Sequence, residues 1–394
     1  MKYNFNEIVQ RDNTNSIKYD FAHHRGKPEG LLPLWVADMD FKTPAPVVEA
    51  LVEKSKHGIF GYSEGGQDYF FILKDWFKTR FDWNIQPEWL ITTPGVVYAI
   101  ATAIRGLTQI GDSIIIQQPV YYPFADTITI NERKLVVNQL VYDNGRYSID
   151  FADFESKIIE NNAKLFILCN PHNPVGRVWT REELVRLGDI CLEHGVIVIS
   201  DEIHQDFIYP GHKHLVFADL KPEFLGITIT CTAPSKTFNL AGLQVSNIFI
   251  ENKEIKRKFK KEMRKGGYNE INIMGIVACT AAYSKGRKWL EELKIYLGEN
   301  LDFIRDFLRE QLPQVKLIEP EGTYLIWLDF SELGLNDEQL EDLIINKAGL
   351  WLDAGTMFGA GGEGFQRINI AAPRLILEQA LTQLERAVLN QDQV

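Results

Sequence analysis

Cysteine is scarce in this sequence, and the few cysteines that occur lie far apart. Cys169, Cys191, Cys231 and Cys279 are in or beside apolar runs and show none of the paired spacings that metal sites or disulfide frameworks use. We therefore expect four buried, reduced thiols.

Long hydrophobic runs and an excess of basic residues are also missing. No run is long enough to cross a bilayer, and residues 1–7 contain no apolar stretch of the kind that a signal peptide needs. The 42 Lys and Arg residues are outnumbered by 53 Asp and Glu residues, which gives a formal net charge of -11. This balance argues against nucleic acid or an anionic membrane as a main partner, and we expect a cytoplasmic protein.

Two motifs that could indicate other kinds of site lack the required context. His23, His24, His212 and His214 do not have the helical spacing of metal ligands, so we predict loop residues and no metal site. Residues 359–364 contain the spaced glycines of a dinucleotide-binding turn, but they precede a strand rather than a helix. We interpret them as a flexible active-site loop.

The chain is long enough for two domains, with 394 residues and 45% hydrophobic content. In its middle, apolar strand-like runs alternate with helical patterns, which predicts an α/β fold with a largely parallel sheet and helices on both faces. One helix is predicted over residues 180–193, because Thr180 and Glu183 have the spacing of a capping box. The strand candidates are residues 113–117, 165–169, 196–200, 227–231 and 245–250.

The last third of the chain has a different pattern. A long amphipathic helix is predicted over residues 289–311, and two strands, 323–330 and 366–370, flank another helix at 336–348. This pattern predicts a smaller α+β domain, over which the first forty or so residues, poor in regular pattern, would lie. The predicted domains are residues 45–288 for the large one, and residues 1–44 with 289–394 for the small one.

Three apolar strands in succession end in polar residues. The strand at 165–169 runs toward Asn173, the next runs into Asp201, and the third runs into the turn before Lys236. The carboxyl ends of parallel strands are where α/β sheets bind ligands. An amide, a carboxylate and a lysine gathered there suit a pyridoxal-phosphate (PLP) enzyme, in which a lysine forms the Schiff base and a carboxylate partners the pyridinium nitrogen.

Each of these residues also has a more ordinary interpretation. A lone lysine is usually exposed, but Lys236 follows a buried-looking strand and precedes an apolar stretch, a setting that suits a partnered amine or one with a lowered pKa. Asp201 could cap a helix, although no obvious helix begins there. Asn173 could serve only a stiff turn between two prolines, or could donate a hydrogen bond to the ring hydroxyl oxygen of the cofactor.

Three further features fit such a site less specifically. Gly95 precedes a helix whose first amides, at Val96 and Val97, could hold a phosphate, although ordinary loop-to-helix junctions look the same. Tyr121 follows a strand and could stack on the pyridine ring or pack against other aromatic residues. Arg367 lies in an apolar strand, where either a substrate carboxylate or a protein acid could pair with it, and we favour the substrate.

Taken in order, these residues resemble the fold-type I PLP enzymes, the aspartate-aminotransferase superfamily, over nearly the whole chain. Within that superfamily, three motifs resemble the MalY/PatB branch of cystathionine β-lyases, or C–S lyases. They are Leu34-Trp35-Val36-Ala37-Asp38-Met39-Asp40-Phe41, Ser200-Asp201-Glu202-Ile203-His204 and Ala233-Pro234-Ser235-Lys236-Thr237-Phe238-Asn239. The resemblance implies a large PLP-binding domain with a mostly parallel seven-stranded sheet, and a smaller α+β domain.

The resemblance also implies roles for individual residues. Lys236, Asp201 and Tyr121 would be catalytic. Arg367, Trp35 and Asp38 would bind the substrate, Arg367 by its carboxylate. The cofactor would contact Lys236, Asp201, Asn173, Tyr121, Val96, Val97, Ser235, Thr232, His204 and Tyr62. The last of these, Tyr62, would reach the cofactor phosphate of a neighbouring subunit, which implies a homodimer with shared active sites.

Two positions depart from the wider superfamily. His204 stands where aminotransferases usually have a tyrosine for the ring hydroxyl, and Gln244 stands where they often have an arginine for the phosphate. A phosphate site without that arginine would rely on the amides of Val96 and Val97, on Ser235 or Thr232, and on Tyr62 from across the interface.

The activity that the resemblance implies is the elimination of a sulfur leaving group. L-cystathionine would give homocysteine, pyruvate and ammonia, and L-cysteine would give hydrogen sulfide, pyruvate and ammonia. Two alternatives remain open: an aminotransferase on the same scaffold, and a regulatory protein that keeps the scaffold and acts by binding another protein. The sequence does not indicate the preferred sulfur substrate.

Overall fold

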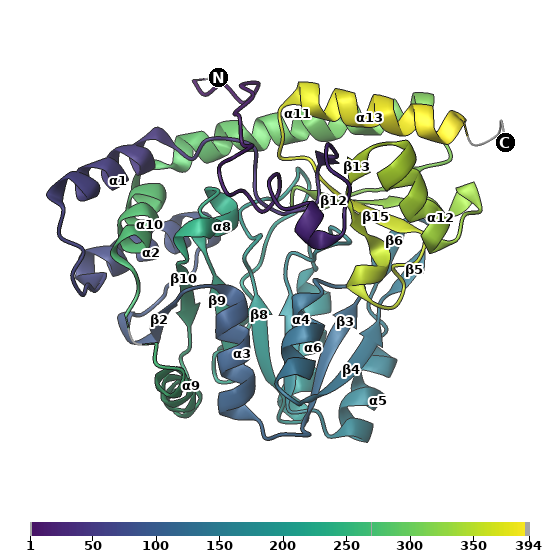
Figure 1. The fold of residues 1–394 in the computed structure, drawn as a ribbon. Helices are drawn as coiled ribbons and strands as arrows, with labels where there is room; N and C mark the ends of the chain where they lie inside the picture. The colour runs from purple at the N-terminus through teal and green to yellow at the C-terminus, as the bar shows by residue number, and fades with distance from the viewer. Residues whose placement is uncertain (1, 269, 391–394) are drawn as a thin grey trace.

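The structure, a computed structural model, describes residues 2–268 and 270–390 (Figure 1). At its centre lies a sheet of seven strands. In order across the sheet, these strands are β2 (Leu90–Thr93), β10 (Ser246–Phe249), β9 (Thr228–Thr232), β8 (Ile197–Asp201), β7 (Leu165–Cys169), β3 (Ser113–Gln118) and β4 (Lys134–Gln139). From β9 to β4 the neighbouring strands are parallel, whereas β10 is antiparallel to both β9 and β2. The predicted α/β fold with a mostly parallel seven-stranded sheet is therefore confirmed.

Helices pack on both faces of this sheet (Figure 1). One face is covered by α3 (Val96–Leu107), α4 (Pro123–Ile130) and α9 (Lys253–Lys265), and the other by α5 (Phe151–Asn161), α6 (Arg181–Glu193) and α7 (Pro222–Leu225). In β3, Ile114 and Ile116 pack with the first group and Ile115 with the second, because successive side chains of a strand point to opposite faces. A strand buried on both sides has no polar face, which explains the unbroken apolar run in the sequence.

The predicted elements of this part lie close to the observed ones. Each of the five strand candidates is a strand of the central sheet, with ends that differ by at most one residue. Helix α6 begins after Thr180, whose side chain accepts a hydrogen bond from Glu183 N at 3.2 Å, while the Glu183 side chain accepts one from Thr180 N at 2.8 Å. The predicted capping box is confirmed. The sequence patterns do not single out β2 and β4, the two edge strands.

A smaller antiparallel sheet lies at the upper right of Figure 1. Its strands, in order, are β11 (Lys316–Ile318), β12 (Leu325–Asp329), β15 (Phe365–Asn369) and β14 (Asp353–Ala354). The helices of this part are α11 (Arg287–Gln311), α12 (Asp337–Asp342) and α13 (Arg374–Leu389). Helix α12 is shorter than the helix predicted at 336–348, since the chain continues as a π-helical turn at Leu343–Lys347.

The N-terminal residues have little regular structure, as expected. A short 3-10 turn occupies His23–Arg25, and strand β1 (Leu32–Pro33) pairs in parallel with β13 (Leu350–Trp351). This pairing holds the N-terminal segment against the last third of the chain, as the purple and yellow ribbons in Figure 1 show. The boundaries of the two domains, after residues 44 and 288, stay a prediction.

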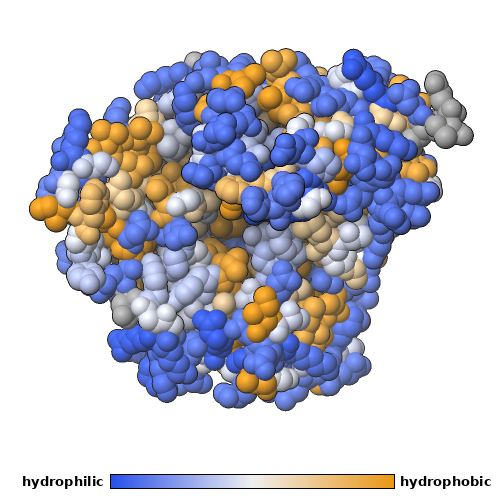
Figure 2. Space-filling model, viewed as in Figure 1, coloured by the Kyte–Doolittle hydropathy of each residue, from blue (hydrophilic) through white to orange (hydrophobic). Residues whose placement is uncertain are grey.

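The remaining helices gather at the left of Figure 1, away from the smaller sheet. They are α1 (Ala45–His57), α2 (Gly66–Phe81) and α10 (Ile273–Lys285), while α8 (Pro234–Thr237) follows β9 and the hairpin β5 (Val141–Asp143)–β6 (Arg146–Ser148) lies at the right. Figure 2 shows hydrophobic residues on the surface at the left end. Val48 and Val52 of α1 and Phe71 of α2 are about half exposed, at 47%, 46% and 56%.

Two of the compositional expectations can be compared with this fold. All four cysteines are buried and unpaired, which confirms the prediction of isolated thiols. Within the described parts of the chain, none of the helices combines the length and the hydrophobicity that crossing a membrane requires.

Candidate active site

The polar residues at the strand ends meet at one cavity of about 210 Å³. It lies at the carboxyl ends of β7, β8 and β9: Asn173 follows β7, Asp201 is the last residue of β8, and Lys236 follows β9. The other predicted site residues that line it are Tyr121, Val96, Val97, Ser235 and His204. The structure therefore brings most of the predicted cofactor contacts together in one place, while their chemical roles remain predictions.

Lys236 lies in the short helix α8, and its amine is held by the backbone of the N-terminal segment. Its Nζ donates a hydrogen bond to the carbonyl oxygen of Ala37 at 2.9 Å. Burial lowers the pKa of Lys236 to about 8; the charge of Asp38 opposes this shift, Arg367 adds to it, and Asp201 opposes it. A lysine with this pKa is partly neutral near physiological pH, as a nucleophile or general base must be.

Asp201 is the last residue of β8 and is buried, with 5% of its surface exposed. Burial raises the pKa of Asp201 to about 7, although the N–H of Ile203, which donates to Oδ1 at 3.1 Å, and the charge of Lys236 both lower it. A positive charge beside this buried carboxyl group would favour its ionised form, so a cationic ligand group would bind well next to it. A protonated pyridine nitrogen is a partner of that kind.

Two aromatic rings complete the wall of the cavity. His204 is buried, and burial together with the charges of Lys236 and Arg367 holds its pKa well below the ordinary range, so the imidazole is neutral at physiological pH. Tyr121 lines the cavity and also packs against Tyr122, with ring centroids 5.5 Å apart. Tyr121 therefore packs against another aromatic residue and also faces the cavity, and its stacking on a pyridine ring stays a prediction.

Arg367, in β15, is buried beside the cavity and has protein partners. Its Nη1 donates to Asn173 Oδ1 at 3.0 Å, and its Nη2 donates to the carbonyl oxygen of Trp35 at 2.9 Å. Nη2 also forms an ion pair with Asp353, the residue opposite Arg367 in the register of β14 and β15. The sequence favours a substrate as the partner of this arginine, whereas the structure supplies a protein acid. Burial raises the pKa of Asp353, and Arg367 opposes that shift.

Besides Arg367, four predicted site residues do not line the cavity. The Thr232 hydroxyl donates to the carbonyl oxygen of Asn247 at 2.9 Å. The Trp35 ring stacks on Trp351 with centroids 4.3 Å apart, and the Trp35 carbonyl oxygen accepts a hydrogen bond from Arg367. Asp38 forms an ion pair with Arg11 at 2.5 Å. The fourth residue, Tyr62, lies in a separate hollow on the surface.

Tyr62 is the most exposed of the predicted residues, with 97% of its surface accessible. It lines a separate surface hollow together with Pro94, Gln244 and Tyr268. Pro94 also lines the cavity that holds Lys236, so the two spaces adjoin at this residue. Tyr62 therefore lines the neighbouring hollow and not the cavity of its own chain.

Comparison with known proteins identifies the family. The model of the family described as aminotransferase class I and II matches residues 30–384. The chain belongs to this family. Cystathionine beta-lyase PatB of Bacillus subtilis (strain 168) is 43% identical to it over 385 residues, which cover 98% of this chain and 100% of PatB. Protein MalY of Escherichia coli (strain K12) is 31% identical over 388 residues, which cover 98% of this chain and 99% of MalY.

A solved structure agrees with this assignment. The crystal structure of cystalysin from Treponema denticola, which contains a pyridoxal 5'-phosphate cofactor, matches with a TM-score of 0.96 and 39% sequence identity. The match covers 99% of this chain and 100% of cystalysin. The resemblance to the MalY/PatB branch of the fold-type I family is therefore confirmed.

Some site residues of this family member are not indicated by its sequence patterns. Ala37 contributes a backbone carbonyl oxygen, which accepts hydrogen bonds from both Lys236 and the Tyr324 hydroxyl. Asp353 pairs with Arg367. Tyr324 lies within the strand predicted at 323–330, and its hydroxyl is an isolated polar group in an otherwise apolar strand. That contrast could have indicated a site residue. No local signal marks a backbone carbonyl or a cross-strand acid.

The glycine-rich segment 359–364 packs against the central sheet. It precedes β15 as expected, but it does not line the cavity. Instead, Ala360 N donates to Gln118 Oε1 at 3.2 Å, and Phe358 O accepts from Val120 N at 2.9 Å, so the segment packs on the end of β3. Gly359, at a φ of +92°, leaves room for the Gln118 side chain, where a Cβ atom would collide with it. The interpretation of the segment as a flexible active-site loop stays a prediction.

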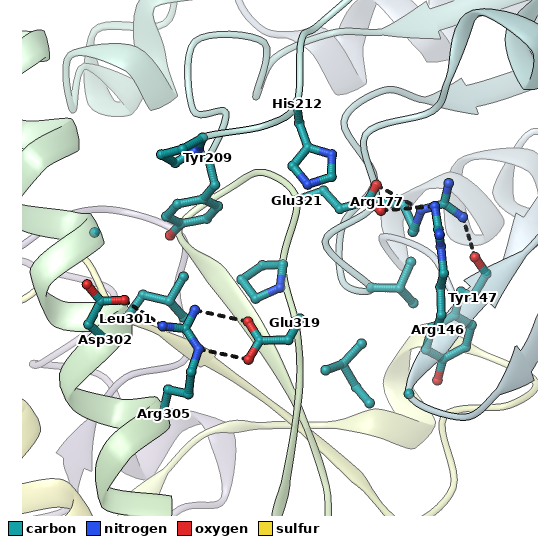
Figure 3. Close-up of a pocket in the computed structure, with 16 residues that line it drawn as sticks. Arg146, Tyr147, Arg177, Tyr209, His212, Leu301, Asp302, Arg305, Glu319 and Glu321 are labelled. Atoms are coloured by element: carbon teal, nitrogen blue, oxygen red, sulfur yellow. Dashed lines mark hydrogen bonds and ion pairs between the residues drawn. The ribbon is translucent and has the colours of Figure 1, made fainter.

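A larger cavity, of about 450 Å³, lies beside α11 (Figure 3). Its charged residues are paired with one another: Arg305 Nε donates to Glu319 at 2.8 Å, and Arg177 Nε donates to Glu321 at 2.9 Å. These pairs neutralise each other and tie segments of the fold together. We place the active site in the smaller cavity despite its size, because Lys236, Asp201 and Asn173 meet there and the pKa values of Lys236 and Asp201 are both shifted by burial.

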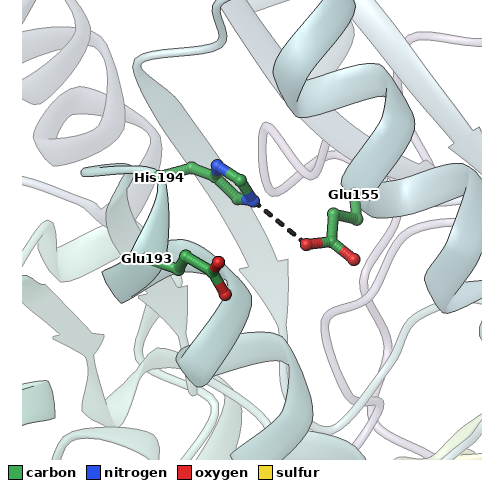
Figure 4. A group of neighbouring side chains, drawn as sticks. All are labelled: Glu155, Glu193 and His194. Atoms are coloured by element: carbon green, nitrogen blue, oxygen red, sulfur yellow. Dashed lines mark hydrogen bonds and ion pairs between the residues drawn. The ribbon is translucent and has the colours of Figure 1, made fainter.

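Three residues with potential metal-ligand groups lie together on α5 and at the end of α6: Glu155, Glu193 and His194 (Figure 4). His194 Nε2 is 3.1 Å from Glu155 Oε1, and this hydrogen bond accounts for their closeness. The contact joins α5 to α6, and we assign it a structural role.

Proposed function

We propose that this protein is a PLP-dependent C–S β-lyase, which eliminates a thiol from Cβ of an L-amino acid and leaves pyruvate and ammonia. The observation that carries the proposal is the meeting of Lys236, Asp201 and Asn173 at one cavity, in a chain that is related to PatB along its full length.

The residues of the cavity fit PLP. Lys236 provides an amine that is partly neutral near physiological pH, Asp201 provides a buried acid for the pyridine nitrogen, and the first turn of α3 at Val96 and Val97 provides backbone amides for the phosphate. When bound, PLP supplies a carbonyl group that couples to amines and a cationic ring that withdraws electrons from the substrate's Cα.

Each residue then has a defined task in the proposed reaction. Arg367 binds the substrate carboxylate through charge-assisted hydrogen bonds. Lys236, once its amine is free and neutral, takes the proton from Cα as general base, while Asp201 keeps the ring nitrogen protonated. His204, held neutral by burial, adds no second positive charge to the site. The thiolate then leaves from Cβ, and hydrolysis of the remaining three-carbon fragment yields pyruvate and ammonia.

We propose L-cystathionine and L-cysteine as substrates, which would release homocysteine and hydrogen sulfide. The test is to measure pyruvate from purified, PLP-loaded protein with each amino acid, in the absence of any 2-oxo acid. An aminotransferase of the same family needs such an acceptor and would give no pyruvate from these substrates. Pyruvate that appears with wild type and disappears with Lys236→Ala supports the lyase; pyruvate only after an acceptor is added contradicts it.

We also propose that two copies of this chain form a dimer in which Tyr62 reaches the neighbouring cavity. Its full exposure and the exposed Val48, Val52 and Phe71 at the same end of the molecule support this arrangement. Mixing Lys236→Ala chains with Tyr62→Ala chains tests it, because mixed dimers would regain one site with both residues intact. Activity that stays at the level of the separate variants, although mass analysis shows mixed dimers, contradicts the shared site.

The cellular location belongs to the same proposal. A cytoplasmic enzyme fits a substrate that is a free amino acid, and fractionation of cells that make the protein tests this. Recovery of the protein in a membrane or secreted fraction contradicts it.

A further inference from the structure

The guanidinium of Arg367 is bonded on most sides. Nη1 donates to Asn173 Oδ1, and Nη2 donates both to the Trp35 carbonyl oxygen and to the Asp353 carboxylate. Within residues 2–268 and 270–390, Nε has no hydrogen-bond partner. The side chains of Arg367 and Asp353 are each only 3% exposed, so water screens their interaction little.

This pattern leaves no complete edge of the guanidinium available. A carboxylate binds bidentately to two parallel N–H groups, either Nε and Nη2 along one edge or Nη1 and Nη2 along the other. Both edges use Nη2, and both hydrogens of Nη2 are already donated, to Trp35 and to Asp353. A substrate carboxylate can therefore bind Arg367 bidentately only if one of these two acceptors moves away.

Asp353 is the acceptor that is free to move. The Trp35 carbonyl group belongs to a backbone segment that is fixed by Asn369, whose Nδ2 donates to the carbonyl oxygens of Val36 at 2.7 Å and Asp38 at 2.6 Å. The Asp353 carboxylate is a side-chain group that can rotate about its own bonds, and β14 has only two residues. We propose that Asp353 is a resident counter-ion of Arg367, which an incoming α-carboxylate displaces and which thereby sets how tightly carboxylates bind.

This arrangement has a consequence for specificity. With ligand bound, two carboxylates compete for one buried guanidinium, and like charges at that separation oppose each other. A plain carboxylic acid has only this contact to offer and would bind weakly. An amino acid also couples through its amine, so the competition favours amino acids over other carboxylates. The inference rests on the proposed role of Arg367 as the carboxylate-binding residue.

Propionate is a suitable probe, because it has a carboxylate and no amine. We would measure its dissociation constant by calorimetry with the PLP-loaded wild type and with Asp353→Asn, which keeps the size of the side chain and removes its charge. Asp329→Asn is the matched control, since Asp329 is a buried acid of the same small sheet that does not contact Arg367. Arg367→Ala shows whether the measured binding uses the arginine.

The expected result is that Asp353→Asn lowers the propionate dissociation constant by about tenfold or more, as the loss of one competing charged hydrogen bond implies. Asp329→Asn should leave it unchanged. An unchanged or higher dissociation constant in a folded Asp353→Asn protein overturns the proposal, because it would mean that Asp353 only orients Arg367.

A second measurement on the unaltered protein covers the case in which Asp353→Asn does not fold. A crystal structure of the wild type with propionate should show the carboxylate on two nitrogens of Arg367, and Asp353 moved off Nη2. Asp353 still bonded to Nη2 beside the ligand overturns the proposal. If propionate binds equally well to Arg367→Ala, then the proposed carboxylate site is wrong, whereas the pyruvate assay reports on the lyase activity independently.

Discussion

Lys236 and Tyr324 donate hydrogen bonds to the same atom, the carbonyl oxygen of Ala37, each at 2.9 Å. The acceptor lies in the N-terminal segment, the lysine follows the central sheet, and the tyrosine precedes a strand of the smaller sheet. Three distant parts of the chain thus define the position of one amine. The environment of Lys236 therefore depends on the tertiary structure and on no single motif.

Replacing Tyr324 by Phe should raise the pKa of Lys236. The Ala37 oxygen would then accept only from the lysine and would stabilise its ammonium form better. The pH at which the lysine titrates should shift upward in the pH profile of activity, and the free energy of unfolding should fall by about 1 kcal/mol. Tyr283→Phe is the control, because the buried Tyr283 hydroxyl has no hydrogen-bond partner in the described part of the chain. Equal pH profiles for the two variants would contradict the shared acceptor.

Replacing Asp201 by Asn should weaken PLP binding and slow turnover. The amide cannot hold the ring nitrogen protonated, and a charge-assisted hydrogen bond is worth about 1.5–3 kcal/mol. We expect the PLP dissociation constant to rise by roughly tenfold to a hundredfold. Spectroscopic titration of the cofactor-free protein with PLP measures this directly. Wild-type affinity in the Asn variant would show that Asp201 does not contact the cofactor.

The cofactor-free protein should become more stable relative to its Lys236→Met variant as the pH rises from about 8 to 10.5. In this range the folded protein binds fewer protons at Lys236 than the unfolded chain, because burial lowers the pKa of this lysine from 10.5 to about 8. Below pH 8 the buried charge costs at most roughly 3 kcal/mol, because each unit of the pKa shift corresponds to about 1.4 kcal/mol. Urea denaturation of both proteins across this range measures the difference. A gap that stays constant with pH would contradict the lowered pKa.

The sequence predicts the centre of the site well because its signals are local. Asn173, Asp201 and Lys236 each follow an apolar strand, and the rule that ligands bind at the carboxyl ends of parallel strands places them together. The strands of the central sheet are also predictable where both faces are buried. The edge strands β2 and β4 are not, since a strand with one neighbour has a shorter or more polar pattern.

Sequence patterns do not predict the parts of the site that depend on the register of paired strands or on backbone atoms. Asp353 meets Arg367 only because β14 and β15 pair in one particular register. Thr232 looks like a phosphate ligand from its position near Lys236, but its hydroxyl is used within the sheet by Asn247. Tyr62 is exposed and lies outside the cavity of its own chain, so its proposed role involves a second copy.

The account depends most directly on Lys236 as the residue that PLP joins covalently. Borohydride reduction of the PLP-loaded protein, followed by proteolysis and mass spectrometry of the peptides, locates the attachment point. We predict a single modified peptide that contains Lys236, and a smaller amount of it when the reduction is carried out during turnover with excess L-cystathionine. A modification at another lysine, or none on protein saturated with PLP, would contradict the account.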